Sequence, residues 1–281
     1  MRRGGRVNRP LDSERRPGRN GCVQTLTTTG WIARTGSQID RIRINEVSCR
    51  VVDGRNVWVK RRTPMSRWLV PIANGFFWLA GNPVEVFTTG AAWQDHELET
   101  FRLLNGSERN VGTLEANSVY AEALPGSDLV GLLEKSKLSS SVMSRVGEAF
   151  RKMHRTWNPI TGEWFSHGDP HLGNVLFDAE NDDIKWVDFE TIHHPRLTVT
   201  ERHADDLLVL LLDLVGRTDA SLWDELSPAF LSGYADLAVL AELKKRLRPA
   251  IGFGALWWAV RTSYLTRPEL RRRIGWLRDR L

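Results

Sequence analysis

The run of glycine, proline and acidic residues at positions 166–191, SHGDPHLGNVLFDAENDDIKWVDFET, constrains the fold of this chain more than any other segment. Pro170 and Gly173 interrupt its first part, HGDPHLGN, which is therefore expected to form a turn and not a helix. Two short apolar runs follow, 175–177 and 184–187, and the acidic DAENDD separates them. This pattern predicts a polar turn that leads directly into a β-hairpin.

Three polar side chains stand at the ends of this predicted hairpin and in the turn before it. Asn174 precedes the first strand and Asp188 follows the second, so strand pairing places both at one edge, with Asp169 just ahead. An amide and a carboxylate suit Mg2+, which takes a few hard oxygen ligands and keeps its waters. A further carboxylate nearby can orient or deprotonate a hydroxyl group. Each residue alone is also a common turn-capping residue, so the prediction rests on the ordered set.

The motifs HGDPHLGNVLFD and WVDFE resemble the catalytic and metal-binding loops of the kinase-like small-molecule phosphotransferases. That superfamily contains the aminoglycoside phosphotransferases, the choline kinases and the lipopolysaccharide-core sugar kinases. The resemblance implies that Asp169 is catalytic and positions the acceptor hydroxyl, that Asn174 binds the metal, and that Asp188 bridges metal and phosphates. It implies ATP and Mg2+ as cofactors. Glu190 stands where protein kinases have a glycine, and this departure is common in the small-molecule branch.

The resemblance covers roughly residues 45–215 and also implies an α+β fold with two lobes of the protein-kinase type. We expect a small β-rich N-terminal lobe for the nucleotide at 22–124. A larger helical lobe that carries the catalytic loop is expected at 125–281. Residues 1–21 are rich in arginine, glycine and proline, and a disordered basic tail is predicted there.

The composition, with 41% hydrophobic and 26% charged residues, is that of an ordinary globular protein. Much of the excess positive charge lies at the two chain ends, and a solvated tail is favoured over a nucleic-acid-binding arm. Cys22 and Cys49 have no metal-binding spacing and predict no disulfide framework, which indicates a reducing compartment. No secretory signal or membrane-spanning run is visible, so we expect a cytoplasmic location. The oligomeric state stays open.

A hairpin is predicted near the start of the β-rich part. Asp53 and Gly54 lie between alternating apolar runs at 47–52 and 57–60, and Lys60 ends the second run. The resemblance implies that Lys60 holds the α and β phosphates of ATP and takes part in catalysis. A solvated lysine in the basic sequence KRR is the alternative.

Glu97 is the predicted partner of Lys60. The segment 93–104 reads as a helix, and Glu97 shares one face with Trp93 and Phe101. A carboxylate on an apolar face is costly unless a cation meets it. The resemblance matches Glu97 to the helix glutamate of the family, with Glu99 as the alternative.

The segment 119–133 resembles the connection between the lobes of kinases, with a strand, an acidic residue, a Pro-Gly linker and a helix. The resemblance implies that adenine hydrogen-bonds backbone groups near Glu122 and Leu124. Ser127 is expected to cap the helix that follows. An ordinary strand-turn-helix is the alternative.

A buried central helix is predicted after position 198. The sequence TVTE at 198–201 has the form of a capping box, and RHADDLLVLLLDLVG behind it is apolar nearly all round. The resemblance implies that Asp206 or Asp205 braces the backbone of the HGD turn, and a role in core structure is the alternative.

An apolar insertion at 63–92 separates Lys60 from the Glu97 helix. Its core at 68–80, WLVPIANGFFWLA, is almost wholly apolar, and Pro71 and Gly75 are expected to break any long helix. Aromatic residues beside arginines are typical of segments that lie in a membrane interface. The segment is predicted either to touch the inner face of a membrane or to form additional core.

The leading hypothesis is ATP- and Mg2+-dependent transfer of the γ-phosphate to a hydroxyl group. The acceptor would be a sugar of lipopolysaccharide or another lipid-linked or small-molecule alcohol. An atypical protein Ser/Thr kinase with a small lobe is one alternative, and a nucleotide-binding scaffold without turnover is another. No nucleic-acid partner is expected.

Overall fold

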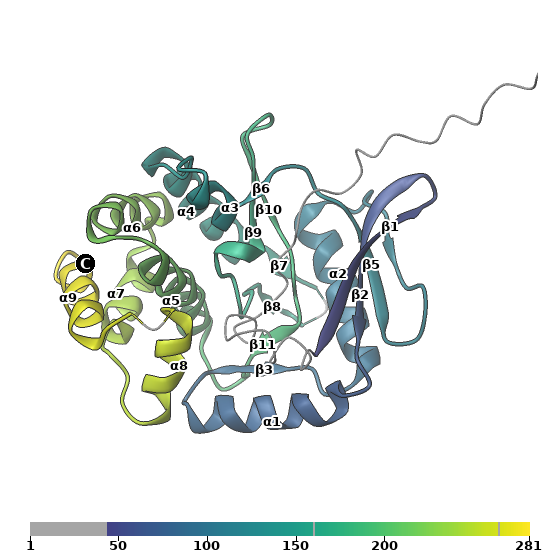
Figure 1. Ribbon diagram of the computed structural model, residues 1–281, viewed down its shortest axis with the longest axis horizontal. Helices are drawn as coiled ribbons and strands as arrows, with labels where there is room; N and C mark the ends of the chain where they lie inside the picture. Colours follow the sequence, from purple (N-terminus) through teal and green to yellow (C-terminus); the bar gives the residue numbers. More distant parts are fainter. Residues whose placement is uncertain (1–43, 160, 264) are drawn as a thin grey trace, which may run out of the picture.

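The computed structural model describes residues 44–159, 161–263 and 265–281, so the predicted tail at 1–21 lies outside the described part. Within these ranges the chain is a mixed α/β structure, with a small sheet region and a mainly helical C-terminal part (Figure 1). The strands are β1 (Asn45–Val52), β2 (Arg55–Arg62), β3 (Val84–Val86), β4 (Val111–Gly112), β5 (Ser118–Glu122), β6 (Ser127–Asp128), β7 (Trp157–Asn158), β8 (Glu163–Trp164), β9 (Val175–Asp178), β10 (Asp183–Trp186) and β11 (Thr191–His193). The helices are α1 (Ser66–Leu79), α2 (Gly90–Asn105), α3 (Leu129–Glu134), α4 (Ser140–His154), the short 3-10 helix η2 (Leu172–Asn174), α5 (Val199–Arg217), α6 (Ala220–Tyr234), α7 (Leu237–Arg246), α8 (Phe253–Arg261) and α9 (Arg267–Arg278).

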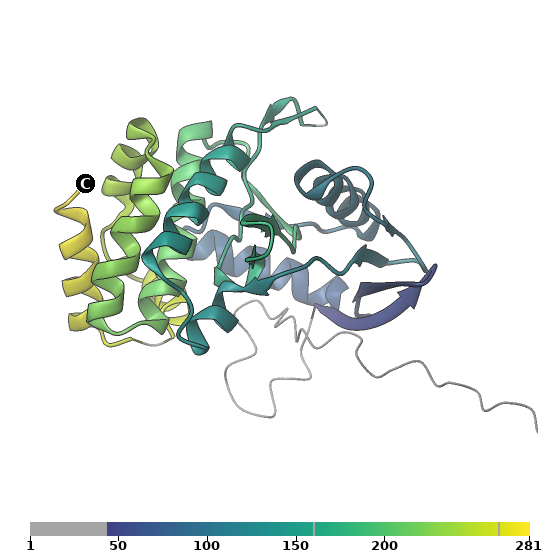
Figure 2. The ribbon, with the colours of Figure 1, turned by 90° about the horizontal axis from the view of Figure 1, so that it is seen from above.

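The predicted first hairpin is confirmed. β1 and β2 are antiparallel with Val47 opposite Lys60, and Asp53 (φ 50°) and Gly54 (φ 75°) take the left-handed conformation that a tight turn needs. β5 pairs with β2 and with β4, which gives a sheet of order β1-β2-β5-β4. Seen from above, the purple strand β1 and the green and yellow helices lie at opposite ends of the molecule (Figure 2).

The insertion differs from the expectation that Pro71 and Gly75 break any long helix. Residues Ser66–Leu79 form one continuous helix, α1, with both residues inside it. The lost hydrogen bond at Pro71 is offset by burial of an apolar stripe. That stripe consists of Val70, Ala73 and Phe77, whose spacing of three and four residues places them on one side of a helix.

α1 is tied to the segment that follows Asp188. The Asn74 side chain donates to the Val86 carbonyl (3.0 Å) and accepts from the Val86 N–H (2.8 Å), which fixes α1 on β3. β3 pairs in turn with β11, with Val86 opposite Thr191. The insertion is therefore part of the framework beside the predicted metal site.

α5 forms the centre of the helical part, as predicted. Its capping box is present, because the Thr198 hydroxyl accepts from the Glu201 N–H and the Glu201 carboxylate accepts from the Thr198 N–H. All positions from 202 to 215 are buried. α6, α7 and α8 contact α5, and α4 packs against α6.

Two local expectations are wrong. Asp128, and not Ser127, caps α3 by accepting from the Gly131 N–H (2.6 Å), because Ser127 is held one residue earlier in the short strand β6 beside β9. Cys49 on β1 is disulfide-bonded, which removes the cysteine argument for a reducing compartment; the other cysteine, Cys22, lies outside the described residues.

None of the helices that the structure describes has the length and apolar character needed to cross a bilayer.

Pro71→Ala tests the continuity of α1. Pro71 lies inside the helix and lacks the N–H that bonds the carbonyl four residues earlier, so alanine restores a donor. Greater freedom of the unfolded chain offsets part of this gain. We expect the free energy of unfolding, measured by urea denaturation, to rise by about 1–2 kcal/mol.

Pro268→Ala is the matched control, since Pro268 sits in the first turn of α9, where no donor is needed. Its free energy of unfolding should stay unchanged or fall slightly. Equal gains at the two sites, or no gain at Pro71, would contradict a helix that runs through Pro71.

Candidate functional site

The second predicted hairpin is confirmed and places its polar ends as expected. β9 and β10 are antiparallel with Val175 opposite Trp186, and the Val187 N–H donates to the Asn174 carbonyl (3.1 Å). Asn174 and Asp188 therefore lie at one edge of the hairpin. Asp188 has a φ of 70°, a conformation that is uncommon for residues other than glycine and that occurs often at functional sites.

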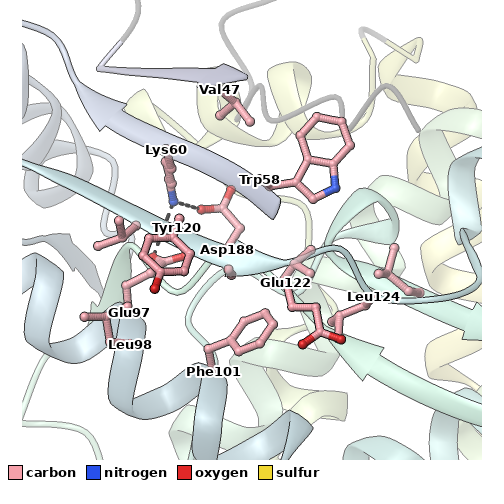
Figure 3. Close-up of a pocket in the computed structure, with 14 residues that line it drawn as sticks. Val47, Trp58, Lys60, Glu97, Leu98, Phe101, Tyr120, Glu122, Leu124 and Asp188 are labelled. Carbon is pink, nitrogen blue, oxygen red and sulfur yellow. Dashed lines mark hydrogen bonds and ion pairs between the residues drawn. The ribbon is translucent and has the colours of Figure 1, made fainter. Parts of the chain in front are cut away.

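Lys60 stands among three carboxylates, one of which is the predicted partner Glu97. Its Nζ lies 3.4 Å from Glu97 Oε2 and forms an ion pair with Asp188 Oδ1 (Figure 3). It also lies 3.3 Å from Glu190 Oε2. Lys60 is only 7% exposed, so the alternative of a solvated lysine is wrong. Glu99, the other proposed partner, is exposed on α2.

The charged groups of this cluster act strongly on one another. Burial acts to lower the pKa of Lys60, but the surrounding carboxylates, Asp188 most of all, outweigh it and hold that pKa above its usual value. Burial raises the pKa of Glu97, and the nearby ammonium only partly opposes the rise. Burial and repulsion by Asp188 raise the pKa of Glu190 to about 7. One ammonium thus faces three acidic groups, and a further cation is favoured there.

A cavity that is partly open to solvent lies beside this cluster (Figure 3). Its walls are mostly apolar, and the charged cluster closes one end of it. The lining residues are Val47, Trp58, Lys60, Glu97, Leu98, Phe101, Val119, Tyr120, Ala121, Glu122, Leu124, Leu176, Val187 and Asp188. A mostly apolar pocket with a few convergent polar groups is the usual form of a small-molecule site.

Glu122 and Leu124 line the cavity, but two backbone donors near them are already used. The Glu122 N–H donates to the Asn110 carbonyl (2.9 Å), and the Ala123 N–H donates to the Asn56 carbonyl (2.9 Å). Any contact with a bound base falls to the Glu122 carbonyl and the Leu124 N–H, and this stays a prediction.

Side chains of α5 hold the predicted catalytic turn, HGDPHLGN at 167–174, through hydrogen bonds to its backbone. Asp206 accepts from the backbone N–H groups of His167 and Gly168, each at 2.8 Å, and Asp213, seven residues further along α5, accepts from the Leu172 N–H (3.1 Å). Asp205 and Asp206 were the alternatives for bracing the turn, and Asp206 is the one that accepts these two hydrogen bonds. Two carboxylates on one face of a buried helix thus fix both ends of the turn.

Gly168 is the residue that this turn requires. Its φ of 84° is left-handed, and a Cβ at this position would lie 2.8 Å from Thr191 Oγ1. Any side chain here would push β11 away from the turn.

Asp169 has a partner that the sequence did not predict. Arg261 Nη1 on α8 lies 2.7 Å from Asp169 Oδ1, and the guanidinium also stacks on the Trp257 ring at 4.4 Å. Although burial acts to raise the pKa of Asp169, the charges of Arg261 and His171 outweigh it and lower that pKa. Arg261 ends the uncharged segment 249–260, and the rule that a buried charge needs a partner was a usable signal.

Asn174 and Asp188 fit a Mg2+ site of the kind that relies on a bound phosphate. The Asn174 Nδ2 donates to the Asp169 carbonyl (2.8 Å), so the remaining amide atom, Oδ1, is the one suited to a cation. No group of three or more His, Cys, Asp or Glu side chains in the described ranges is arranged around a metal position. Mg2+ often takes only one or two protein ligands together with waters and phosphate oxygens, so this pair stays the predicted ligand set.

Asp206→Asn tests the bracing of the turn. Burial acts to raise the pKa of Asp206, but His193 and His154 lower it well below its usual value. The stability from this ionised group is therefore present above the unfolded pKa and is lost as pH falls through the folded pKa. We expect the variant to lose on the order of 3 kcal/mol of unfolding free energy at pH 7.

The difference between the wild type and the Asp206→Asn variant should shrink below about pH 4, where the unfolded carboxyl takes up a proton. Denaturant unfolding at several pH values measures this. Asp95→Asn, at an exposed position of α2, is the control and should be neutral throughout. A gap that is independent of pH would show that Asp206 acts through packing and not through its charge.

Neither a protein-family model nor a curated protein matches this chain.

Proposed function

We propose that this protein is an ATP- and Mg2+-dependent phosphotransferase with a two-lobed protein-kinase-like fold. The γ-phosphate would pass to a hydroxyl group of a small-molecule or lipid-linked sugar acceptor. The observation that carries the proposal is the position of buried Lys60. It pairs with Glu97 and Asp188 at the charged end of an apolar cavity.

The cluster around Lys60 suits the phosphate end of a nucleotide. Glu97 on α2 holds the Lys60 ammonium on the side of the cavity, as a lysine that contacts phosphates requires. Asp188 and Asn174 are the residues that would hold the metal, and bound Mg2+ would neutralise charge on the phosphate oxygens. Trp58 and Phe101 supply apolar surface for the base at the other end.

Asp169 is suited to orient an acceptor hydroxyl. Its pKa is lowered, so the group is ionised at neutral pH and accepts a hydrogen bond. Arg261 contacts Oδ1, which leaves Oδ2 as the oxygen for the acceptor. Arg261 is thus a positioning residue that fixes the carboxylate, and the acceptor would bind between the catalytic turn and α8.

A nucleotide-binding scaffold is the second candidate, and the ion pair between Asp169 and Arg261 favours it, since one carboxylate oxygen is already occupied. Radiolabelled ATP offered with lipid-linked sugars, free sugars, amino alcohols and protein separates the candidates. Transfer to one acceptor class supports the phosphotransferase, whereas Mg2+-dependent ATP binding with no transfer to any of them supports the scaffold.

Asp169→Asn should abolish phosphate transfer and leave binding of ATP with Mg2+ within about twofold, because the residue lies outside the cavity lining. Transfer is followed with radiolabelled ATP and binding by calorimetry. Asp182→Asn, at the exposed tip of the β9–β10 hairpin, keeps full activity as the control. Near wild-type transfer by Asp169→Asn would remove the catalytic assignment.

Asp188→Ala should weaken ATP binding at least tenfold with Mg2+ present and much less in a chelator, because the carboxylate would act through the ion. ATP titrations with Mg2+ and with EDTA give the two affinities. An equal loss under both conditions would mean that Asp188 serves Lys60 alone and that the metal site is wrong.

A further inference from the structure

The outer side of α1 is mostly apolar, with Arg67 as its one exposed charged residue. Its exposed large apolar side chains are Trp68, Ile72, Trp78 and Leu79, which are 65%, 68%, 71% and 53% exposed. They follow the i, i+4, i+10, i+11 spacing of one helix face, opposite the buried stripe that packs on the protein. Arg67 is the only charged residue between positions 63 and 84. A surface helix normally places polar residues outward, so α1 has two apolar faces.

A second apolar segment adjoins this face at the C-terminal end of α1. α8 stands beside that end (Figure 1), where Phe77 and Trp257 rings lie 5.2 Å apart edge to face. The exposed side chains of this segment are Ile251, Phe253 and Leu256, at 89%, 56% and 50%. We call the seven exposed residues of the two segments the apolar platform.

The exposed surface of α1 offers few groups that could hydrogen-bond a protein partner. Protein interfaces carry about one hydrogen bond per 100–200 Å², whereas the exposed residues of α1 outside the platform are Arg67, Pro71 and Gly75, and of these only Arg67 has a polar side chain. Exposed apolar patches of this kind mark interaction sites. Lipid acyl chains require no hydrogen bonds, and a helix with such a face can lie in a bilayer interface.

The charge next to the platform is positive. The Arg67 guanidinium stacks on the Trp68 ring at 5.5 Å, and Arg248 is exposed just before Ile251. No aspartate or glutamate occurs at positions 63–84 or 247–260. Tryptophan with arginine beside it suits the boundary between acyl chains and anionic head groups.

We propose that the apolar platform docks this protein on the surface of an anionic lipid bilayer. The docking itself does not depend on the proposed enzymatic function. If that function also holds, the acceptor comes from the bilayer. α8 carries both platform residues and Arg261, which contacts Asp169, so the membrane and the acceptor side of the site would be adjacent.

The test is co-sedimentation of the full chain with vesicles of phosphatidylcholine, with and without phosphatidylglycerol. Wild type should bind the anionic vesicles at least tenfold more tightly. Combined Trp68→Ser, Ile72→Ser and Trp78→Ser should weaken binding tenfold or more. Its Tm and its ATP affinity should stay those of wild type, since these side chains are exposed and lie outside the cavity.

Trp157→Ser combined with Leu237→Ser is the matched control, because these apolar residues are also exposed (50% and 83%) but belong to β7 and α7. This variant should bind vesicles like wild type. Arg67→Ser with Arg248→Ser should lose the preference for anionic vesicles.

Three results would overturn the proposal. One is no vesicle binding by wild type. Another is full binding by the platform variant together with loss of binding in a chain that starts at residue 22, which would assign binding to the basic N-terminal residues. The third is a wild-type dimer that the platform variant converts to monomer without any effect on vesicles. ATP binding is measured on the same samples. Protein that binds ATP but not vesicles contradicts the docking alone, and protein that binds vesicles but not ATP contradicts the proposed function alone.

Discussion

Burial of the Lys60 ammonium is the constraint on which the site depends. A buried cation must be paired, and Lys60 is paired by carboxylates from two elements that lie far from it in sequence. Glu97 comes from α2, and Asp188 follows the β9–β10 hairpin. Pairing with the Lys60 ammonium therefore joins the sheet, α2 and the β9–β10 hairpin at one place. The same point lines one end of the apolar cavity, where three carboxylates around one ammonium favour a further cation.

α5 provides the second constraint, because two of its carboxylates hold the predicted catalytic turn. Asp206 and Asp213 point from one face of a buried helix to backbone N–H groups of the turn. The turn has little regular structure of its own, so its backbone donors need these partners. Arg261 then fixes the Asp169 carboxylate from α8. The helical part therefore fixes the conformation of the turn, whereas Lys60 itself is carried by the sheet.

The features predicted well from the sequence are those with a local or periodic cause. The Asp53–Gly54 turn set the first hairpin, and helical spacing together with the cost of a buried charge identified Glu97. The features missed depend on distant residues. Pro71 was expected to end a helix, but burial of one face of α1 outweighs the lost hydrogen bond. The partner of Asp169 is Arg261, 92 positions away, and no local pattern joins the two.

The most direct test of the account is a double-mutant cycle on ATP affinity with Lys60→Met and Glu97→Gln, measured by calorimetry in Mg2+. If Glu97 holds Lys60 for the phosphates, the two losses overlap, and a coupling energy of about 0.5–3 kcal/mol is expected. Glu99→Gln in place of Glu97→Gln gives the control cycle, which should be additive because Glu99 is exposed. Strict additivity for Lys60 and Glu97, or no ATP binding by wild type, would contradict the account.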